Sequence, residues 1–298
     1  MIALGYLLTR VGFLSERALR DLNSLTYWVG LPCLLLHRVA AAPPDVASVA
    51  GLLAVTVGAT GVAIALGVLC GRLLGLAPEL RGTFTQGVFR GNLAFIGLPV
   101  VMYAFSGAGE ASSAIQANAL LAFGPLVVIY NVAAVAVLLL PGRGFEAGAL
   151  RQAVTGLLTN PILIGCLAGL LLALGEVALP RMLDRTLAAI GQMALPLALL
   201  GIGGTLRTTR IRGRLALAAA GALIKVLLVP ATGLGLAWAL GLSAEHTRIA
   251  LILLACPTAA ASFVLARQLG GDSALASSMI VLSNLFALPA MTLVLWLA

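Results

Sequence analysis

The sequence predicts an all-α polytopic membrane protein with ten transmembrane helices, arranged as two inverted repeats of five helices. Three observations lead to this prediction. Hydrophobic residues make up 61% of the 298 residues and charged residues only 9%, against about 45–50% and 25% in soluble domains. The second half repeats the first at a shift of 164 residues. The basic residues are divided unequally between alternate loops.

The sequence contains ten apolar segments, and all but the first are close to or longer than the roughly 20 residues that a helix needs to cross a bilayer. They are residues 1–9, 22–40, 46–70, 83–105, 112–140, 154–174, 186–206, 214–240, 247–268 and 273–297. The first segment is short because Arg10 follows it. Under the repeat, Met1 corresponds to Gly165, inside the sixth segment. We therefore expect a truncated first helix that lacks the counterpart of residues 154–164.

The internal repeat rests on helix-breaking residues that align without gaps. The shift of 164 residues places Pro32 on Pro196 and Pro125 on Pro289, in register with matching glycines. Such matches are rarer by chance than leucine matches in an apolar chain. The predicted division is a first repeat at 1–140, a short cytoplasmic linker at 141–153 and a second repeat at 154–298.

The predicted topology follows from the odd number of spans in each repeat, because an odd number gives the second repeat the opposite orientation in the membrane. The loops after odd-numbered spans hold twelve arginines, and the loops after even-numbered spans hold four. Basic loops stay in the cytoplasm. We therefore expect a multi-pass protein of the cell's inner (plasma) membrane with both termini outside.

The charged residues and cysteines argue against several functions. The net charge of +8 comes from short loops, so we expect no nucleic-acid partner. The four cysteines form no CxxC pair, and we expect neither a metal site nor a cofactor. All ten acidic residues fall in loops or at span ends, which disfavours cation exchange through a buried carboxylate. His37 and His246 lie at different span ends, so we expect no enzyme.

Two apolar segments are interrupted at corresponding places in the two halves. Residues 89–99 contain Arg90-Gly91-Asn92, and residues 254–262 contain Pro257. A broken helix in a bilayer leaves backbone groups without partners, at several kcal/mol each. Paired breaks of this kind are the usual sequence sign of a solute site in a membrane protein built from inverted repeats.

Arg90 and Lys225 are the two charges predicted to lie inside the membrane. Such charges are costly and usually functional. Arg90 either attracts a carboxylate of the substrate or extends to the cytoplasmic interface. Lys225, the only lysine, acts either in charge balance, proton coupling or substrate attraction, or as a donor to carbonyls freed by Pro230 or a broken neighbour.

The neutral polar residues at the breaks also have two interpretations each. Asn92 contacts the substrate or caps freed backbone groups. Thr258 and Ser262 are expected one helical turn apart on one face, where hydroxyls often bond to their own helix. Asn131 and Asn284 are expected to bond between helices. The predicted substrate site comprises Arg90, Gly91, Asn92, Pro99, Asn131, Pro257, Thr258 and Ser262, with Lys225 for coupling or charge balance.

The segment Gly91-Asn92-Leu93-Ala94-Phe95-Ile96-Gly97-Leu98-Pro99 resembles the auxin efflux carrier (AEC) family, the bacterial relatives of plant PIN carriers. Asn160-Pro161, Ala194-Leu195-Pro196 and Cys256-Pro257-Thr258 fit the same family in the same order. The resemblance implies a fold like that of sodium/proton antiporters and bile-acid symporters. In that fold the broken helices 83–105 and 247–268 cross at the substrate site.

The resemblance also implies a function and partners. Bacterial members are usually associated with malate, malonate or other organic anions, and the plant relatives with auxin-like acids. We expect secondary active or potential-driven transport of a small organic anion by alternating access, with membrane lipid as a partner and a homodimer left open. The alternatives are a sodium- or proton-coupled symporter of a larger organic anion, and a membrane sensor or channel that does not transport.

Overall fold

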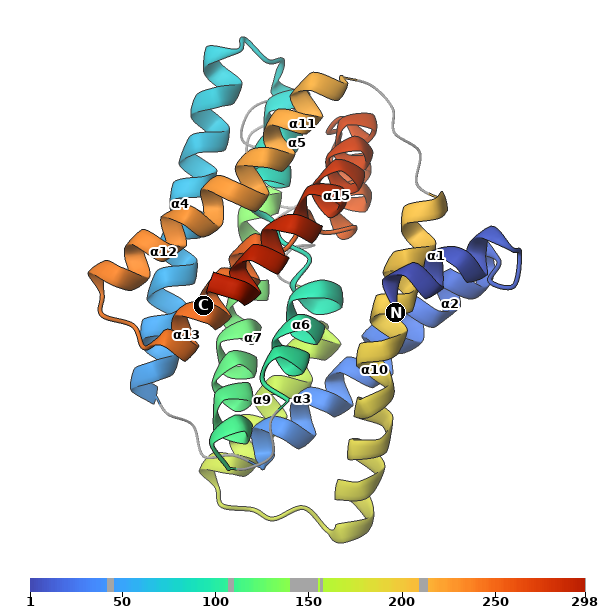
Figure 1. Cartoon of the computed structure of the whole chain (residues 1–298), viewed down its shortest axis with the longest axis vertical. Coiled ribbons are helices and arrows are strands. Elements are labelled where there is room, and N and C mark those ends of the chain that lie inside the picture. Colours follow the sequence, from blue (N-terminus) through green and yellow to red (C-terminus); the bar gives the residue numbers. More distant parts are fainter. Residues whose placement is uncertain (42–45, 107–109, 140–154, 156–157, 209–213, 298) are drawn as a thin grey trace. The chain divides into compact units, whose positions relative to one another are not determined.

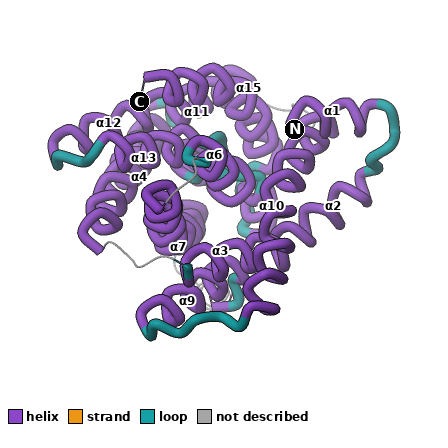
Figure 2. Tube along the Cα trace, turned by 60° about the horizontal axis from the view of Figure 1, so that its bottom comes forward, coloured by secondary structure: helices purple, strands orange, loops and turns teal. Residues whose placement is uncertain are grey.

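The described part of the chain is helical. The computed structural model describes residues 1–41, 46–106, 110–139, 155, 158–208 and 214–297. Within these residues Figure 2 shows helices joined by loops and no strand. A helix satisfies its backbone groups within one segment, which suits a chain this apolar. The all-α prediction is confirmed, while the predicted linker at 141–153 lies outside the described residues.

Figure 1 labels most of the helices. In chain order the elements are α1 (Ile2–Arg10), α2 (Glu16–Leu25), η1 (Thr26–Gly30), α3 (Leu31–Ala40), α4 (Val46–Leu73), α5 (Pro78–Phe89), η2 (Leu93–Gly97), α6 (Leu98–Ala104), α7 (Glu110–Leu139), α9 (Pro161–Leu174), α10 (Arg181–Thr208), α11 (Leu215–Leu223), η3 (Ile224–Leu228), α12 (Val229–Ala239), α13 (Ala244–Ala255), α14 (Ala261–Gln268) and α15 (Ser273–Leu297). The three η segments are single π-helical turns: η1 and η3 connect two α-helices, and η2 precedes α6.

Five helical stretches among the described residues are long and apolar enough to cross a membrane. They are Val49–Leu73, Ser112–Leu139, Arg181–Arg207, Leu215–Ala239 and Ser273–Trp296. Shorter apolar helices occupy Leu93–Ala104 and Pro161–Leu174. The chain is therefore a multi-pass membrane protein. The full set of ten spans and the inverted repeat remain predictions.

The helices form two compact units. Unit 1 comprises Met1–Val49, Ala94–Pro125 and Leu158–Thr209, and unit 2 comprises Ala50–Leu93, Leu126–Leu157 and Arg210–Ala298. Each unit takes segments from both predicted repeats. The repeats describe similarity along the sequence and the units describe packing, so one division does not test the other.

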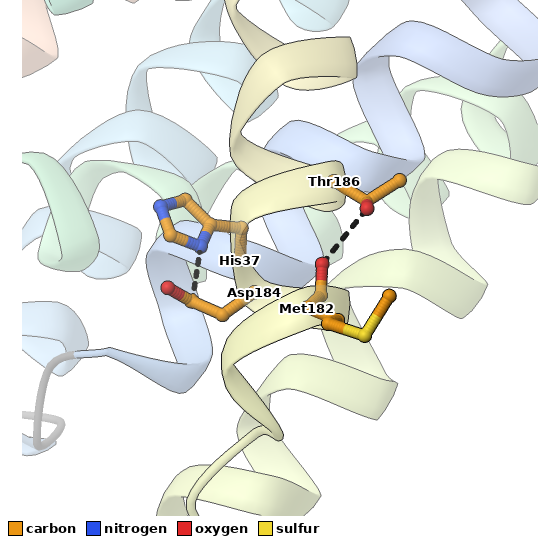
Figure 3. Close-up of polar contacts among 4 residues, drawn as sticks. All are labelled: His37, Met182, Asp184 and Thr186. Carbon is orange, nitrogen blue, oxygen red and sulfur yellow. Dashed lines mark hydrogen bonds and ion pairs between the residues drawn. The ribbon is translucent and has the colours of Figure 1, made fainter.

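Unit 1 packs its helices closely at glycines. A Cβ added to Gly165 of α9 would lie 2.7 Å from the carbonyl oxygen of Pro32 in α3. In the same unit His37 Nδ1 lies 2.9 Å from Asp184 Oδ1, which joins α3 to α10 (Figure 3). Thr186 in the next turn of α10 donates to the carbonyl of Met182. These contacts hold α3 between α9 and α10.

A helix start at Asn160 divides the sixth predicted segment, 154–174, of which residues 154, 156 and 157 lie outside the described residues. Helix α9 starts at Pro161, where the Asn160 side chain accepts hydrogen bonds from the N–H groups of Ile162 and Leu163. Asparagine at the N-cap and proline in the first turn are both favourable at a helix start. Hydropathy alone did not separate this cap from the apolar residues before it.

Unit 2 is built around α15, which packs on α11, α13, α14 and α5. Glycines again permit close contact, because a Cβ at Gly221 of α11 would meet Phe84 of α5 and Met279 of α15 within 3 Å. This packing brings α5, α13 and α14 together. Helix α5 precedes the first predicted interruption, and α13 and α14 lie on either side of the second.

Candidate functional site

The first interruption follows α5. Helix α5 ends at Phe89, and Arg90 has an extended backbone with φ −77° and ψ 94°. The next helical turn, η2, begins only at Leu93. The predicted break at Arg90-Gly91-Asn92, which we name the first interruption, is confirmed. The side chains of Phe89 and Tyr130 of α7 pack edge to face at this end of α5.

The second interruption, Cys256 to Ala260, separates α13 from α14. Helix α13 ends at Ala255, and Cys256 has an extended backbone with φ −52° and ψ 136°. Proline disfavours helical backbone at the residue before it, and Pro257 also lacks an N–H to continue the ladder. Helix α14 starts at Ala261. The predicted break at Pro257 is confirmed.

The two interruptions bond to each other through their backbones within unit 2. The N–H of Asn92 donates to the carbonyl of Pro257 at 2.7 Å, and the N–H of Ala259 donates to the carbonyl of Arg90 at 2.9 Å. Gly91 and Thr258 form an antiparallel bridge between these bonds. Each break therefore supplies hydrogen-bond partners for backbone groups that lose their helical partners at the other break. This pairing removes much of the free-energy cost of an interrupted helix.

Thr258 lies inside the second interruption, not on a helix with Ser262. The expectation that both residues share one helical face is wrong, because α14 begins only at Ala261. The Thr258 hydroxyl donates to the carbonyl of Gly87 in α5 at 2.8 Å, and its N–H donates to Ser283 Oγ at 2.9 Å. The hydroxyl proton therefore serves to bind the two broken helices together.

Arg90 lies within unit 2, with 8% of its surface exposed. Its Nη2 donates to Asn131 Oδ1 of α7 at 2.6 Å. Asn131 thus makes the predicted bond between helices. The guanidinium is buried beside the first interruption, and both interpretations of Arg90, attraction of a substrate carboxylate and extension to the cytoplasmic interface, stay predictions.

Lys225 is fully buried in the π-helical turn η3. Its Nζ donates to the carbonyl of Leu254, near the end of α13, at 2.8 Å. In an unbroken helix that carbonyl would accept from the N–H of Thr258, which here bonds to Ser283. Lys225 is therefore the donor to a carbonyl freed by a broken neighbour. The bond leaves the ammonium charge in place, so the other interpretation, a role in charge balance, proton coupling or substrate attraction, stays a prediction.

The remaining predicted residues fall in two places. Gly91 faces Lys225, since a Cβ added to it would lie 3.4 Å from Nζ and 3.2 Å from the Cβ of Cys256. The Asn92 side-chain amide is nearly buried and has no hydrogen-bond partner among the described residues. Pro99 lies in the first turn of α6, which belongs to unit 1.

Among the described residues Asn284 bonds within its own helix, and not between helices as predicted. Its Nδ2 donates to the carbonyl of Ile280, in its own helix α15, at 2.7 Å. An amide at an apolar helix position can be satisfied locally or by a neighbour, and the sequence does not distinguish these.

Two residues at the site were not singled out from the sequence. Gln86 of α5 donates through Nε2 to the carbonyl of Ser262 at 3.2 Å. Ser283 of α15 accepts from the N–H of Thr258 and donates to the carbonyl of Ile280. Gln86 could have been found from its place one helical turn before Arg90 in an apolar segment. Ser283 gave no such signal.

The chain also matches a known family. The family model described as membrane transport protein (Mem_trans) covers residues 1–141 and 148–295. No curated protein sequence matches the chain. The matched region holds both interruptions and nearly the whole sequence, which confirms the resemblance seen in the Gly91–Pro99 motif. The chain belongs to this family of membrane transport proteins, the auxin efflux carrier family.

Proposed function

We propose that this protein is a secondary transporter that carries a small organic anion, such as malate, malonate or an auxin-like acid, by alternating access. The observation that carries the proposal is the pairing of the two interruptions through Asn92, Pro257, Ala259 and Arg90. Backbone that departs from the helix inside an apolar bundle is expected where it binds a solute.

The charges around the interruptions support an anion as the substrate. Arg90 and Lys225 both lie at these breaks, where Arg90 donates to the Asn131 amide and Lys225 donates to the Leu254 carbonyl. The Asn92 amide adds a donor whose hydrogens are not used within the described residues. A carboxylate would accept hydrogen bonds from such donors, and charge-assisted bonds of this kind are about twice as strong as neutral ones.

We further propose the ten-helix inverted repeat as the architecture. The interruptions fall in segments that correspond under the shift of 164 residues. Two inverted repeats would let the halves exchange roles as the site opens to either side. Both termini would face outward across the inner membrane. A topology reporter fused after Ala298 should be active outside the cytoplasm, and activity only in the cytoplasm would contradict this orientation.

Flux measurements on the purified protein test the proposed function. Proteoliposomes would be given a panel of labelled organic acids, with and without a pH gradient and with sodium or potassium outside. We expect saturable uptake of at least one small carboxylate. Single-channel currents without saturable flux would favour a channel. Uptake that depends strictly on sodium would favour the cation-coupled symporter.

A further inference from the structure

We propose that Gln86 and Ser262 form a subsite for a hydroxyl group of the transported anion, so that hydroxy-substituted carboxylates are preferred over their unsubstituted analogues. The inference rests on the proposed transport of an organic anion. It adds two residues from different broken helices, Gln86 of α5 and Ser262 of α14, to the site.

Gln86 and Ser262 each carry a buried polar atom that the protein leaves unused. Both side chains are 1% exposed. Gln86 Oε1 and Ser262 Oγ have no hydrogen-bond partner among the described residues. Buried polar atoms without partners are rare and costly, so each calls for a physical reason.

The two unused atoms belong to residues that are already bonded to each other. Gln86 Nε2 donates to the Ser262 carbonyl at 3.2 Å, which fixes the amide with its oxygen turned away from that carbonyl. The Ser262 N–H donates to the Ala259 carbonyl at 2.9 Å. The Gln86 oxygen and the Ser262 hydroxyl are therefore the groups that remain for a ligand beside the interruptions.

Several other buried hydroxyls in unit 2 find partners in the protein. Thr258 donates to the Gly87 carbonyl, Ser283 to the Ile280 carbonyl, and Thr56 to the Leu52 carbonyl one turn earlier in α4. In the same way Ser262 could bond to the carbonyl three or four residues before it, which belongs to Ala259 or Thr258. The Ala259 carbonyl already accepts from the Ser262 N–H, and Thr258 lies outside the helix. The break thus deprives Ser262 of its ordinary partner.

The chemistry of the two atoms selects the ligand group. Gln86 Oε1 only accepts, so a carboxylate oxygen would repel it. Ser262 Oγ both donates and accepts. A hydroxyl can donate to Gln86 and accept from Ser262 at once. A cation could also bind two oxygens, but Arg90 lies one turn from Gln86 and Lys225 lies in the same unit, so positive charge is disfavoured.

Matched pairs of acids that differ by one hydroxyl test the subsite. Lactate and propionate, glycolate and acetate, and malate and succinate would compete for uptake into proteoliposomes. In the wild-type protein we expect the hydroxy acid of the preferred pair to compete about tenfold better or more, because sites built to bind a hydroxyl reject analogues without it. Ser262→Ala and Gln86→Leu should each reduce this preference to about threefold or less while the unsubstituted acid is still carried.

Thr85→Val is the matched control. Thr85 is also buried in α5 with an unpartnered hydroxyl, but it contacts Gly67 of α4. The preference should not change in this variant. Equal competition by both members of every pair in the wild type would overturn the subsite while anion transport stands. The subsite would also be overturned if Ser262→Ala reduced the uptake of both acids of a pair to the same extent. A preference for the hydroxy acid that appears only with sodium would overturn it as well. If no acid is taken up, the proposed function fails and the subsite with it.

Discussion

The two interruptions solve the same backbone problem with different side chains. The first is three residues long, contains no proline and carries its own charge on Arg90. The second is five residues long and neutral, with Pro257 to end the helix, and its cation comes from Lys225 on η3. Their backbones pair with each other, yet the charged groups do not follow the repeat. The comparison indicates that the breaks belong to the fold, whereas a role for the two charges in transport is part of the proposed function.

Both cations also suit the helix ends that they approach. Arg90 directly follows α5, and Lys225 Nζ contacts a carbonyl in the last turn of α13. The C-terminal end of a helix carries a partial negative charge that a cation stabilises. This stabilisation helps to keep two charges inside an apolar unit. It does not cancel a full unit of charge, so each cation can still attract an anion.

The largest expected effect is that of Lys225→Met. Methionine keeps much of the stem and removes the charge at the second interruption. Among the described residues Lys225 makes no ion pair, so no carboxylate there would be left buried alone. We expect transport to be lost, or to become insensitive to pH, in protein that still inserts into the membrane. Uptake between about pH 5 and 8, beside the wild type, measures this.

Arg214→Met is the control for Lys225→Met. Arg214 is exposed at the N-cap of α11. The substitution therefore removes a positive charge from the same helical segment but outside the buried site. Its transport should resemble that of the wild type. If Lys225→Met also transports normally over the pH range, Lys225 serves only as the donor to Leu254, and Arg90 is left as the candidate for anion attraction.

The first interruption is tested by Asn92→Ala. The backbone bond from Asn92 to Pro257 is kept in this variant, and only the side-chain amide is lost. Substrate binding should weaken by about 1–3 kcal/mol if a charged group loses a donor. Asn284→Ala removes an amide that is already bonded within α15 and should leave affinity unchanged. Unchanged substrate affinity in well-folded Asn92→Ala protein would show that this amide does not bind the substrate.

Sequence reasoning located the helices and both interruptions because these depend on local properties. Hydropathy marks long apolar segments, and Pro257 cannot continue a helix wherever the chain folds. The partners of the polar side chains depend on tertiary packing. Thr258 reaches Gly87 and Gln86 reaches Ser262 across more than 170 residues of sequence. The assignment of Thr258 and Ser262 to one face failed for a local reason, since the interruption extends past Thr258 to Ala260.

Thr258→Val tests the bond that joins the two broken helices. Valine keeps the shape and leaves the Gly87 carbonyl of α5 without the hydroxyl that it accepts from. We expect a loss of about 1–2 kcal/mol in stability, seen as a lower melting temperature in detergent. Thr56→Val is the comparison, because the Thr56 hydroxyl bonds to its own helix. Equal shifts in the two variants would mean that the bond between the helices adds nothing special.

The smallest expected effect is that of Gly91→Ala, where the interruptions come closest. The new Cβ would lie 3.2 Å from the Cβ of Cys256 and 3.4 Å from Lys225 Nζ. These contacts are tight, but the lysine end can move and Gly91 has no positive φ that would strain an alanine. We expect a loss of about 1 kcal/mol or less in stability, with transport retained.

Gly82→Ala is the contrasting variant, because its Cβ would lie 2.6 Å from the backbone oxygen of Val137, which cannot move freely. A larger drop in melting temperature for Gly91→Ala than for Gly82→Ala would mean that the paired interruptions are packed more rigidly than the helices around them.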